Sequence, residues 1–521
     1  MSYNGIFSFI VAAVPIIWLL ISLSKLKMPA YLASIIAFAL TVVIAVLYYA
    51  MPALRVMQAT VEGTMLALFP IIFIIVSALF VYNTTLKTGS MDKIKSMLSS
   101  LSPDRRIQGL ILAFAFGGFL EAVAGFGTAV AIPAGILVAM GFRPILVAKI
   151  CLIANTVPVA FGVLGVPIIT LSQVTSLPLD KITLYTALQL IPLAVILPLV
   201  LVFAITGSVK KIKGVICISL LSGIVFSVGQ TLTALYIGPE LAAIVGSLSS
   251  LLAIVLFLKI FPVKNAWTFS GEKSEGVNSS SAIGATDAIK AWSSYLLILL
   301  LVFAVKFIPA LNILNNFPFT VSKQFYFGVG GKPMSFQLAT SSGTILLVSA
   351  ILGGLIQGAS VKILLSVLTK TIKQIKRTII TVVSIVVLAK VMGYSGMVNS
   401  IANTLAAASG RFYPIIAPLI GTLGTFITGS DTSSNVLFGN LQKQTALQLG
   451  MNPEWLASAN ATGATIGKMI SPQSIAIAST ATDLTNQEGK ILGETIKYCL
   501  VFVVIMGLLI YAFSGIIKFL P

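Results

Sequence analysis

Residues 428–435 read Thr-Gly-Ser-Asp-Thr-Ser-Ser-Asn, a dense polar run in the middle of the otherwise apolar stretch 412–450. Each arm of that stretch is short for the hydrocarbon core of a bilayer, about 30 Å thick, because a helix rises about 1.5 Å per residue. We therefore expect a re-entrant helical hairpin, with two thin spans as the alternative. Stretch 107–140 is also apolar and broken centrally by small residues, so a second hairpin is expected there.

The composition of the chain places these hairpins in a membrane. Of 521 residues, 57% are hydrophobic and 9% are charged, whereas soluble proteins carry about 25% charged residues. Such a chain cannot cover a water-facing surface, so we expect an all-α polytopic protein in a lipid bilayer. About twelve transmembrane helices of roughly 20 apolar residues are expected. They lie near 5–23, 29–50, 63–86, 145–172, 182–207, 212–236, 240–260, 291–308, 342–359, 378–395, 455–476 and 491–517.

The net charge of +19 has a membrane explanation, and no nucleic-acid partner is expected. The basic residues lie in short clusters between apolar runs, at Lys25 and Lys27 and within 87–106, 210–213 and 370–377. Cytoplasmic loops of polytopic proteins carry such an excess of Lys and Arg. Placing every cluster inside the cell predicts that the N- and C-termini are both extracellular. The first apolar run is expected to be a transmembrane helix rather than a cleaved signal peptide.

The second half of the chain repeats the first. The ordered series Asn155, Gly162, Pro167 recurs with identical spacing as Asn460, Gly467, Pro472. Under the predicted topology the two copies enter the membrane from opposite sides, which is the architecture of secondary transporters. The expected division is a first inverted repeat, a flexible Ser- and Gly-rich linker and a second inverted repeat. The bounds are 1–262 with hairpin 107–140 and broken helix 145–172, then 263–290, then 291–521 with hairpin 412–450 and broken helix 455–476.

Two carboxylates are expected at membrane depth, Glu121 in the first hairpin and Asp431 in the second. A buried charge there costs several kcal/mol, about 2.5–3.5 on insertion scales, so it must be protonated, paired or bound to a cation. A structural ion pair or a helix cap is the alternative. Because the chain has no histidine, any proton relay must use carboxylates. Lys468, at a helix break, either pairs with a substrate carboxylate or snorkels to the cytoplasmic side. Lys390 is expected at an interface as an anchor.

The remaining candidates are polar groups and turn residues at the hairpin tips and helix breaks. Glycines allow a close backbone approach to a ligand, and a helix N-terminus favours a carboxylate. The substrate-binding candidates are Gly125, Phe126, Gly127, Thr128, Asn155, Thr156, Thr432, Ser433, Ser434, Asn435, Asn460, Thr462, Lys468 and Ser471. The proton-coupling candidates are Glu121 and Asp431. No metal-binding spacing or cofactor motif is present, so we expect neither a metal site nor a cofactor.

Four runs in both halves resemble the L-lactate permease family, which includes glycolate permeases. They are Phe119-Leu-Glu121 with Ala124-Gly-Phe-Gly127, Asn155-Thr156 with Pro158-Val-Ala-Phe-Gly162, Gly429-Ser-Asp-Thr-Ser-Ser-Asn435, and Gly467-Lys-Met-Ile-Ser-Pro-Gln-Ser-Ile-Ala-Ile-Ala478. The resemblance extends from about residue 60 to 510. The sequence departs from the family pattern at Ala122 and Ala129, which puts the substrate in doubt more than the fold.

The resemblance implies import of L-lactate, glycolate or a related 2-hydroxymonocarboxylate by proton symport across the cytoplasmic membrane of a prokaryote. It also implies an elevator-like transport domain beside a scaffold, and a possible homodimer. Three alternatives stay open at this point: sodium coupling with Asp431 as a cation ligand, a small-anion channel, and a membrane-embedded enzyme. The lack of histidine and of metal-ligand clusters argues against the enzyme.

Overall fold

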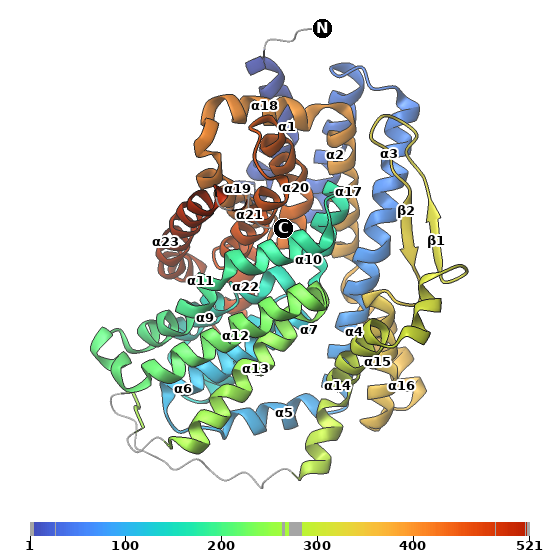
Figure 1. The fold of residues 1–521 in the computed structure, drawn as a ribbon. Coiled ribbons are helices and arrows are strands. Elements are labelled where there is room, and N and C mark those ends of the chain that lie inside the picture. The colour runs from blue at the N-terminus through green and yellow to red at the C-terminus, as the bar shows by residue number, and fades with distance from the viewer. Residues whose placement is uncertain are drawn as a thin grey trace.

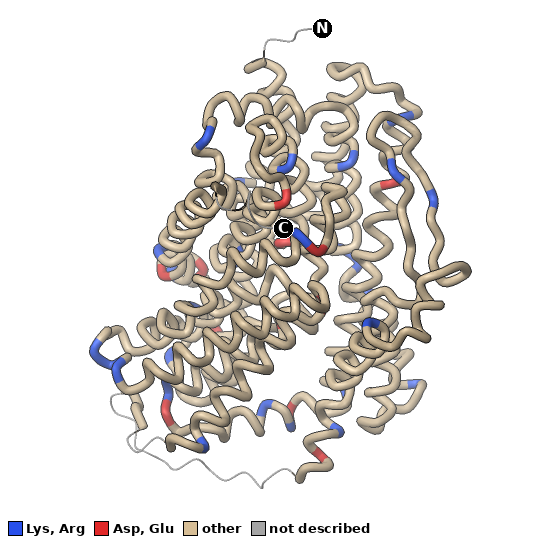
Figure 2. The backbone as a smooth tube through the Cα atoms, in the orientation of Figure 1, with Lys and Arg blue, Asp and Glu red and all other residues tan. Residues whose placement is uncertain are grey.

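The computed structural model describes residues 5–26, 28–262, 266–269, 284–484, 486–515 and 517. Within these residues the fold is helical apart from one two-stranded antiparallel sheet (Figure 1). Most of the expected linker, together with Lys27, lies outside the described residues. Figure 2 shows that Lys and Arg gather mainly in connections and near helix ends, as expected of membrane helices.

One group of elements, called the frame helices below, packs together on one side of the molecule. Helix α17 packs against α2 and α3, and α4 packs against α15 and α16 (Figure 1). The frame helices are α1 (Gly5–Ser24), α2 (Ala30–Leu47), α3 (Ala53–Leu66), α4 (Phe73–Lys87), α14 (Ala285–Phe307), α15 (Ser342–Ile356), α16 (Val361–Gln374) and α17 (Lys376–Ser395). Strands β1 (Thr320–Lys323) and β2 (Met334–Gln337) lie beside α3.

A second group, called the core helices, contains both expected hairpins and both expected broken helices. Its members are α6 (Arg105–Gly109), α7 (Gly117–Val123), α8 (Thr128–Ala139), α9 (Pro144–Ala154), α10 (Gly162–Thr175), α11 (Leu179–Thr206), α12 (Ile216–Tyr236), α13 (Pro239–Ile260), α19 (Tyr413–Thr428), α20 (Asp431–Gln448), α21 (Pro453–Lys468), α22 (Pro472–Ala481) and α23 (Glu488–Ser514). Shorter helical turns cover Ala67–Ile72, Leu110–Phe116, Pro158–Phe161, Val209–Val215, Pro309–Asn315 and Gly410–Phe412.

Packing between the two halves is reciprocal. Helix α8 of the first half packs against α22 of the second, and α10 of the first packs against α20 of the second. Helices α5 (Ser90–Ser99) and α18 (Met397–Ser409) each follow a glycine with positive φ, Gly89 at +73° and Gly396 at +91°. They lie at opposite ends of the molecule in Figure 1. Two helices that follow equivalent glycines in the sequence therefore lie at opposite ends of the fold.

The set of long helices differs from the expected one. Eleven helices of the described residues are long and apolar enough to cross a membrane, rather than about twelve. Arg105–Val123 qualifies as one of them, although it was expected to be only a hairpin arm. Segment 342–359 does not, because α15 has 15 residues, and segment 455–476 is divided between α21 and α22.

The segment 309–341, which none of the expected spans covers, contains a β-hairpin in which Thr320 pairs with Gln337. Its Tyr326 ring stacks on Tyr394 of α17, with centroids 3.7 Å apart. Tyr394 and Lys390 both donate to Glu62 Oε1, at 2.8 and 2.7 Å. Lys390, expected at an interface, therefore pairs with a carboxylate on α3, distant in the sequence, inside the frame helices.

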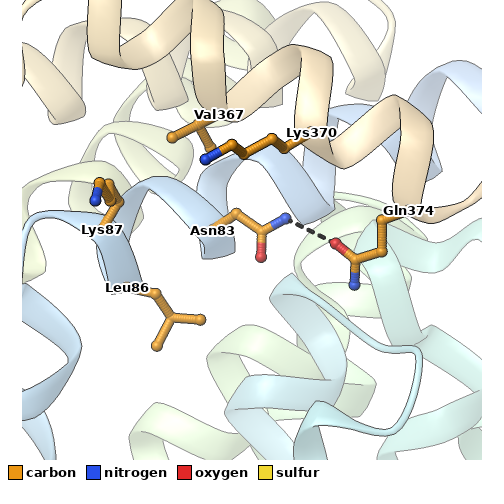
Figure 3. Close-up of a pocket in the computed structure, with 6 residues that line it drawn as sticks. All are labelled: Asn83, Leu86, Lys87, Val367, Lys370 and Gln374. Atoms are coloured by element: carbon orange, nitrogen blue, oxygen red, sulfur yellow. Dashed lines mark hydrogen bonds between the residues drawn. The ribbon is translucent and has the colours of Figure 1, made fainter.

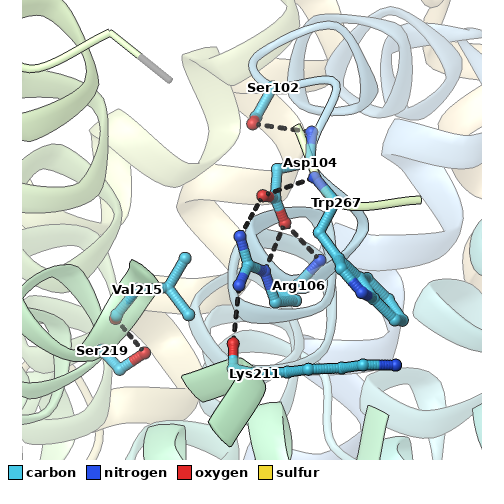
Figure 4. A network of polar contacts seen from close by, with 7 residues as sticks. All are labelled: Ser102, Asp104, Arg106, Lys211, Val215, Ser219 and Trp267. Carbon is cyan, nitrogen blue, oxygen red and sulfur yellow. Dashed lines mark hydrogen bonds and ion pairs between the residues drawn. The ribbon is translucent and has the colours of Figure 1, made fainter. Parts of the chain in front are cut away.

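The start of the first hairpin is held by a buried ion pair (Figure 4). Asp104 is fully buried and caps α6, and its carboxylate accepts two hydrogen bonds from the Arg106 guanidinium, at 2.7 and 3.0 Å. The same carboxylate accepts from the backbone N–H of Trp267, in the connection between the two halves, at 3.0 Å. Arg106 also donates to the Lys211 carbonyl at 2.6 Å. This network fixes where the first hairpin enters the bundle.

Candidate functional site

The first hairpin reverses at residues 124–127, between α7 and α8. Gly125, Phe126 and Gly127 all have positive φ, at +59°, +51° and +87°. The Thr128 hydroxyl donates to the Gly125 carbonyl at 2.8 Å and secures the turn. A Cβ atom on Gly127 would collide with Ile477 of α22, so only glycine allows the tip to approach that helix.

The second hairpin reverses at Gly429 and Ser430, between α19 and α20. Gly429 has φ +73°, and a Cβ atom there would collide with Gln473 of α22. Ser430 caps α20 by accepting a hydrogen bond from the Ser433 N–H at 3.3 Å. Both hairpin tips therefore meet at α22, directly after the break in the second broken helix.

The two breaks lie beside the tips. The first broken helix ends as α9 at Ala154 and resumes as α10 at Gly162, with a short turn at Pro158–Phe161 between them. The second ends as α21 at Lys468 and resumes as α22 at Pro472. Proline lacks the N–H of an unbroken helix, which explains the interruptions at Pro158 and Pro472. Backbone polar groups are thereby gathered next to the tips.

A cavity of about 470 Å³ lies where the tips, the breaks and the frame helices meet. The hairpins contribute Glu121, Phe126, Ile427, Thr428, Gly429, Ser430, Asp431, Thr432 and Ser433. The broken helices contribute Val159, Gly162, Val163, Val166, Pro167, Lys468, Pro472 and Gln473. The frame wall consists of Leu23, Met28, Pro29, Ala30, Tyr31, Ile75, Arg377, Thr378, Thr381 and Val382. The cavity thus has one polar wall from the core helices and one mixed wall from the frame.

Three charged side chains define the polar wall. Glu121 and Asp431 are only 5% and 3% exposed. Glu121 Oε2 and both carboxylate oxygens of Asp431 are buried and have no hydrogen-bond partner among the described residues. Lys468 Nζ donates to the Gly429 carbonyl at 2.7 Å and interacts electrostatically with both carboxylates. Unpartnered buried oxygens of this kind are costly, so they make this cavity the candidate site for a ligand or a proton.

The structure brings six of the predicted residues to the cavity and leaves the others behind it. The six are Glu121, Phe126, Asp431, Thr432, Ser433 and Lys468. Gly125, Gly127 and Thr128 form the turn that presents Phe126. Asn155 and Thr156 do not line the cavity, but their side-chain polar atoms are buried without partners in the described part of the chain.

The remaining predicted residues form hydrogen bonds within the protein. Asn435 donates to the Pro167 carbonyl at 3.1 Å and accepts from the Asn460 amide at 2.9 Å. Ser434 donates to the Gly421 carbonyl at 2.9 Å. Two further hydroxyls are engaged as well: Thr462 bonds Gln189 Oε1 at 3.0 Å, and Ser471 caps α22 at Ser474. Asn435 thereby joins the second hairpin to both broken helices, and none of these side chains lines the cavity.

The frame wall was not found from the sequence. Arg377 lies with its guanidinium 5.6 Å from the centre of the Tyr31 ring, and both line the cavity beside Thr378 and Thr381. Their only signal was the basic cluster 370–377, which was interpreted as a cytoplasmic loop. Their role at the cavity depends on packing between distant helices, which no local pattern reports.

A helical bundle with paired hairpin tips, paired broken helices and a buried, carboxylate-containing cavity defines a membrane transporter. The family model for L-lactate permease matches residues 8–517. The chain therefore belongs to the L-lactate permease family.

Individual relatives agree with this assignment over nearly their full length. The L-lactate permease of Streptococcus iniae is 45% identical over 459 residues, covering 87% of this chain and 94% of that protein. The glycolate permease GlcA of Escherichia coli K12 is 37% identical, covering 98% and 97%. The structure of MtrF from Neisseria gonorrhoeae, described among antimetabolite efflux pumps, aligns with a TM-score of 0.51 at 13% identity, over 92% of this chain and 94% of that one. The last likeness concerns the fold alone.

Proposed function

We propose that this protein carries L-lactate, glycolate or a related 2-hydroxymonocarboxylate across the cytoplasmic membrane of a prokaryote by proton symport. Relatives named L-lactate permease and glycolate permease support the substrate class. The observation that carries the coupling is the presence of Glu121, Asp431 and Lys468 in one buried cavity. With two carboxyl groups and one amine in the cavity, the net charge of the site changes when a proton binds and also when an anionic substrate binds.

A count of charges gives the stoichiometry. Net charge within the membrane is costly, so the site moves most readily when it is neutral. For the core-helix side chains that line the cavity, leaving Arg377 with the frame, neutrality without substrate is reached with a charged Lys468, one ionised carboxylate and one protonated carboxyl. A bound lactate adds one negative charge, and protonation of the second carboxyl restores neutrality. Each cycle then moves one proton with one lactate and no net charge.

The substrate carboxylate is proposed to lie between Lys468 and the first turn of α20. The N-terminus of that helix carries partial positive charge, and its N–H groups point toward the tip. The hydroxyls of Thr432 and Ser433 are available for the 2-hydroxyl of the substrate. Phe126 and Val163 supply apolar surface for its carbon chain. This division explains why a small hydroxy acid, rather than a simple anion, fits the cavity.

The candidates behind the cavity receive different proposed roles. Two residues remain proposed contacts for the substrate or for the carboxyl that carries the proton. They are Asn155, which interacts with Glu121, and Thr156, whose hydroxyl is buried without a partner among the described residues. The tip residues Gly125, Gly127 and Thr128 act through the backbone turn. Four polar side chains position the hairpin and the helix breaks: Ser434, Asn435, Asn460 and Thr462. Ser471 is proposed to fix the start of α22, against which both tips rest.

Movement of the core helices against the frame is proposed to give alternating access. Helix α8 has 12 residues and is about 18 Å long, short of the roughly 30 Å core, which supports a re-entrant hairpin. The reciprocal α8–α22 and α10–α20 packing supports two inverted repeats. The cavity extends to Tyr31 and Arg377, which the charge clusters place on the cytoplasmic side. The structure would then be the inward-facing state, with both termini outside.

Uptake of labelled L-lactate into proteoliposomes tests this function. One pH unit across the membrane, alkaline inside, should accumulate lactate about tenfold by one-to-one coupling. A membrane potential alone should drive no uptake, because the loaded site is neutral. Uptake driven by a sodium gradient or by potential alone would overturn proton symport. A competition panel with glycolate and pyruvate reports the substrate range, and accelerated exchange during counterflow distinguishes a carrier from a channel.

A further inference from the structure

A second cavity of about 420 Å³ lies between α4 and α16, and it shares no lining residue with the transport cavity. Asn83, Leu86 and Lys87 line it from α4, and Val367, Lys370 and Gln374 line it from α16 (Figure 3). This cavity lies within the frame helices, at the end of α4 that the basic clusters place on the cytoplasmic side. Nothing in the transport mechanism uses it.

The cavity carries uncompensated positive charge. Lys87 and Lys370 are its only charged lining residues, and neither has an ion-pair partner among the described residues. Nearby lysines differ: Lys93 pairs with Asp287 at 2.8 Å and Lys95 with Asp92 at 3.0 Å. Figure 3 shows the Lys370 side chain extending along the gap between the helices toward the side of α4 that carries Lys87. Two lysines without acids create a site for an anion.

Two amide side chains lie beside this charge. Asn83 Nδ2 donates to Thr371 Oγ1 at 2.9 Å and to Gln374 Oε1 at 3.3 Å, which joins the two helices beneath the cavity. The Gln374 carbonyl accepts that bond, and Figure 3 shows its amide nitrogen on the side away from Lys370. A ligand with several acceptor oxygens, such as a phosphate, matches the two ammonium groups.

Apolar surface continues from the cavity to the outside of the protein. Leu86, which lines it, is 38% exposed. On α16, Ile363 lies on the same helical face as Lys370 and Gln374 and is 37% exposed. A helix that presents lysines beside exposed aliphatic side chains is typical of a bilayer interface. A free phosphate has no apolar groups to pack on this surface, whereas the acyl chains of a lipid would cover it.

We infer that the α4–α16 cavity binds the headgroup phosphate of an acidic phospholipid, with its acyl chains along Leu86 and Ile363. Basic pockets between membrane helices on the cytoplasmic side bind such headgroups. The bound lipid would hold the frame helices at a fixed depth while the core helices move. The inference is independent of the transported substrate.

Native mass spectrometry of the delipidated, full-length protein tests this site with added phosphatidylglycerol or phosphatidylcholine. Wild-type protein should bind phosphatidylglycerol more tightly. The double variant Lys87→Gln/Lys370→Gln should bind phosphatidylglycerol about thirty-fold more weakly. Each lysine near an acidic lipid contributes a factor of about five to six in affinity, and the two factors multiply. Lys362→Gln, a matched loss of charge on α16 outside the cavity, should leave the affinity unchanged.

Further arms identify the source of the phosphate and control for folding. The variant Lys87→Arg/Lys370→Arg keeps both charges and should retain phosphatidylglycerol, even if the glutamine variant fails to fold. Equal affinity of wild-type protein for phosphatidylcholine, or full affinity of the glutamine variant for phosphatidylglycerol, would refute the inference. Displacement of the lipid by millimolar inorganic phosphate would assign the cavity to a free anion instead and overturn the lipid site.

Discussion

Replacing Lys468 with glutamine should abolish most lactate transport, because it removes the cation that interacts with both buried acids of the cavity. The ammonium donates to the Gly429 carbonyl at the second hairpin tip and interacts with Glu121 and Asp431. Loss of one partner from a buried charge pair costs about 3–5 kcal/mol. Lys468 is only partly buried, so we take the lower end of that range. At about 1.4 kcal/mol per tenfold, the expected loss in kcat/KM is roughly a hundredfold.

Lys443→Gln provides a matched control. Lys443 lies on α20 of the same hairpin, is also partly buried, and donates to a backbone carbonyl, that of Thr175, at 2.6 Å. It does not line the transport cavity. Initial rates of labelled lactate uptake in proteoliposomes should therefore fall strongly for Lys468→Gln and only slightly for Lys443→Gln, at equal amounts of reconstituted protein.

Comparing the Lys468 and Lys443 variants distinguishes two roles of the lysine: its positive charge and its hydrogen bond to a backbone carbonyl. If both variants lost transport equally, Lys468 would act only as a lysine–carbonyl tether, and the charge count proposed for the site would be wrong. Lys468→Arg keeps the charge and should retain more activity than Lys468→Gln. Wild-type kinetics in Lys468→Gln would refute any role for the ammonium in binding or coupling.

Three further changes test separate parts of the structure. Glu121→Gln and Asp431→Asn should each abolish accumulation driven by a pH gradient while sparing lactate exchange; concentrative uptake by both variants would contradict the proton-carrier role. Asp104→Asn should lower the free energy of unfolding by about 3–5 kcal/mol, because it leaves a buried guanidinium unpaired, and a thermal melt in detergent reports it. Gly429→Ala should impair uptake through its collision with α22, whereas Gly450→Ala, with similar φ and open space around it, should keep near-normal uptake.

Hydropathy predicted the long helices because a continuous apolar run identifies a span without reference to its neighbours. Helices α11 and α13 begin and end within a few residues of the expected bounds. The β-hairpin was missed because it depends on distant partners. Tyr326 stacks on Tyr394, which itself bonds to Glu62, so the segment is ordered by contacts that no local pattern contains.

The sequence predicted which polar and charged side chains lie near the candidate site, but it did not predict which of them form hydrogen bonds with each other. Glu121 and Asp431 stood out because charge at membrane depth requires an explanation. The amides of Asn435 and Asn460 had the same appearance in the sequence, but in the structure they bond to each other. Which side chains meet inside a bundle depends on how each helix is rotated about its axis and how far it is shifted along it. The identity of a polar residue in the sequence does not report either quantity.

The two halves contribute equivalent positions with different chemistry to the cavity. Lys468 follows Gly467 as Val163 follows Gly162, and both Lys468 and Val163 line the cavity. With no cation at either position, two protonated carboxyls would already make the empty site neutral, and a bound lactate would leave a charge that neither carboxyl could cancel by taking up a further proton. One cation gives a neutral state both with and without substrate, separated by one proton. The proposed coupling would therefore depend on a difference between the proposed repeats, whereas their similarity would supply the paired tips and breaks that enclose the site.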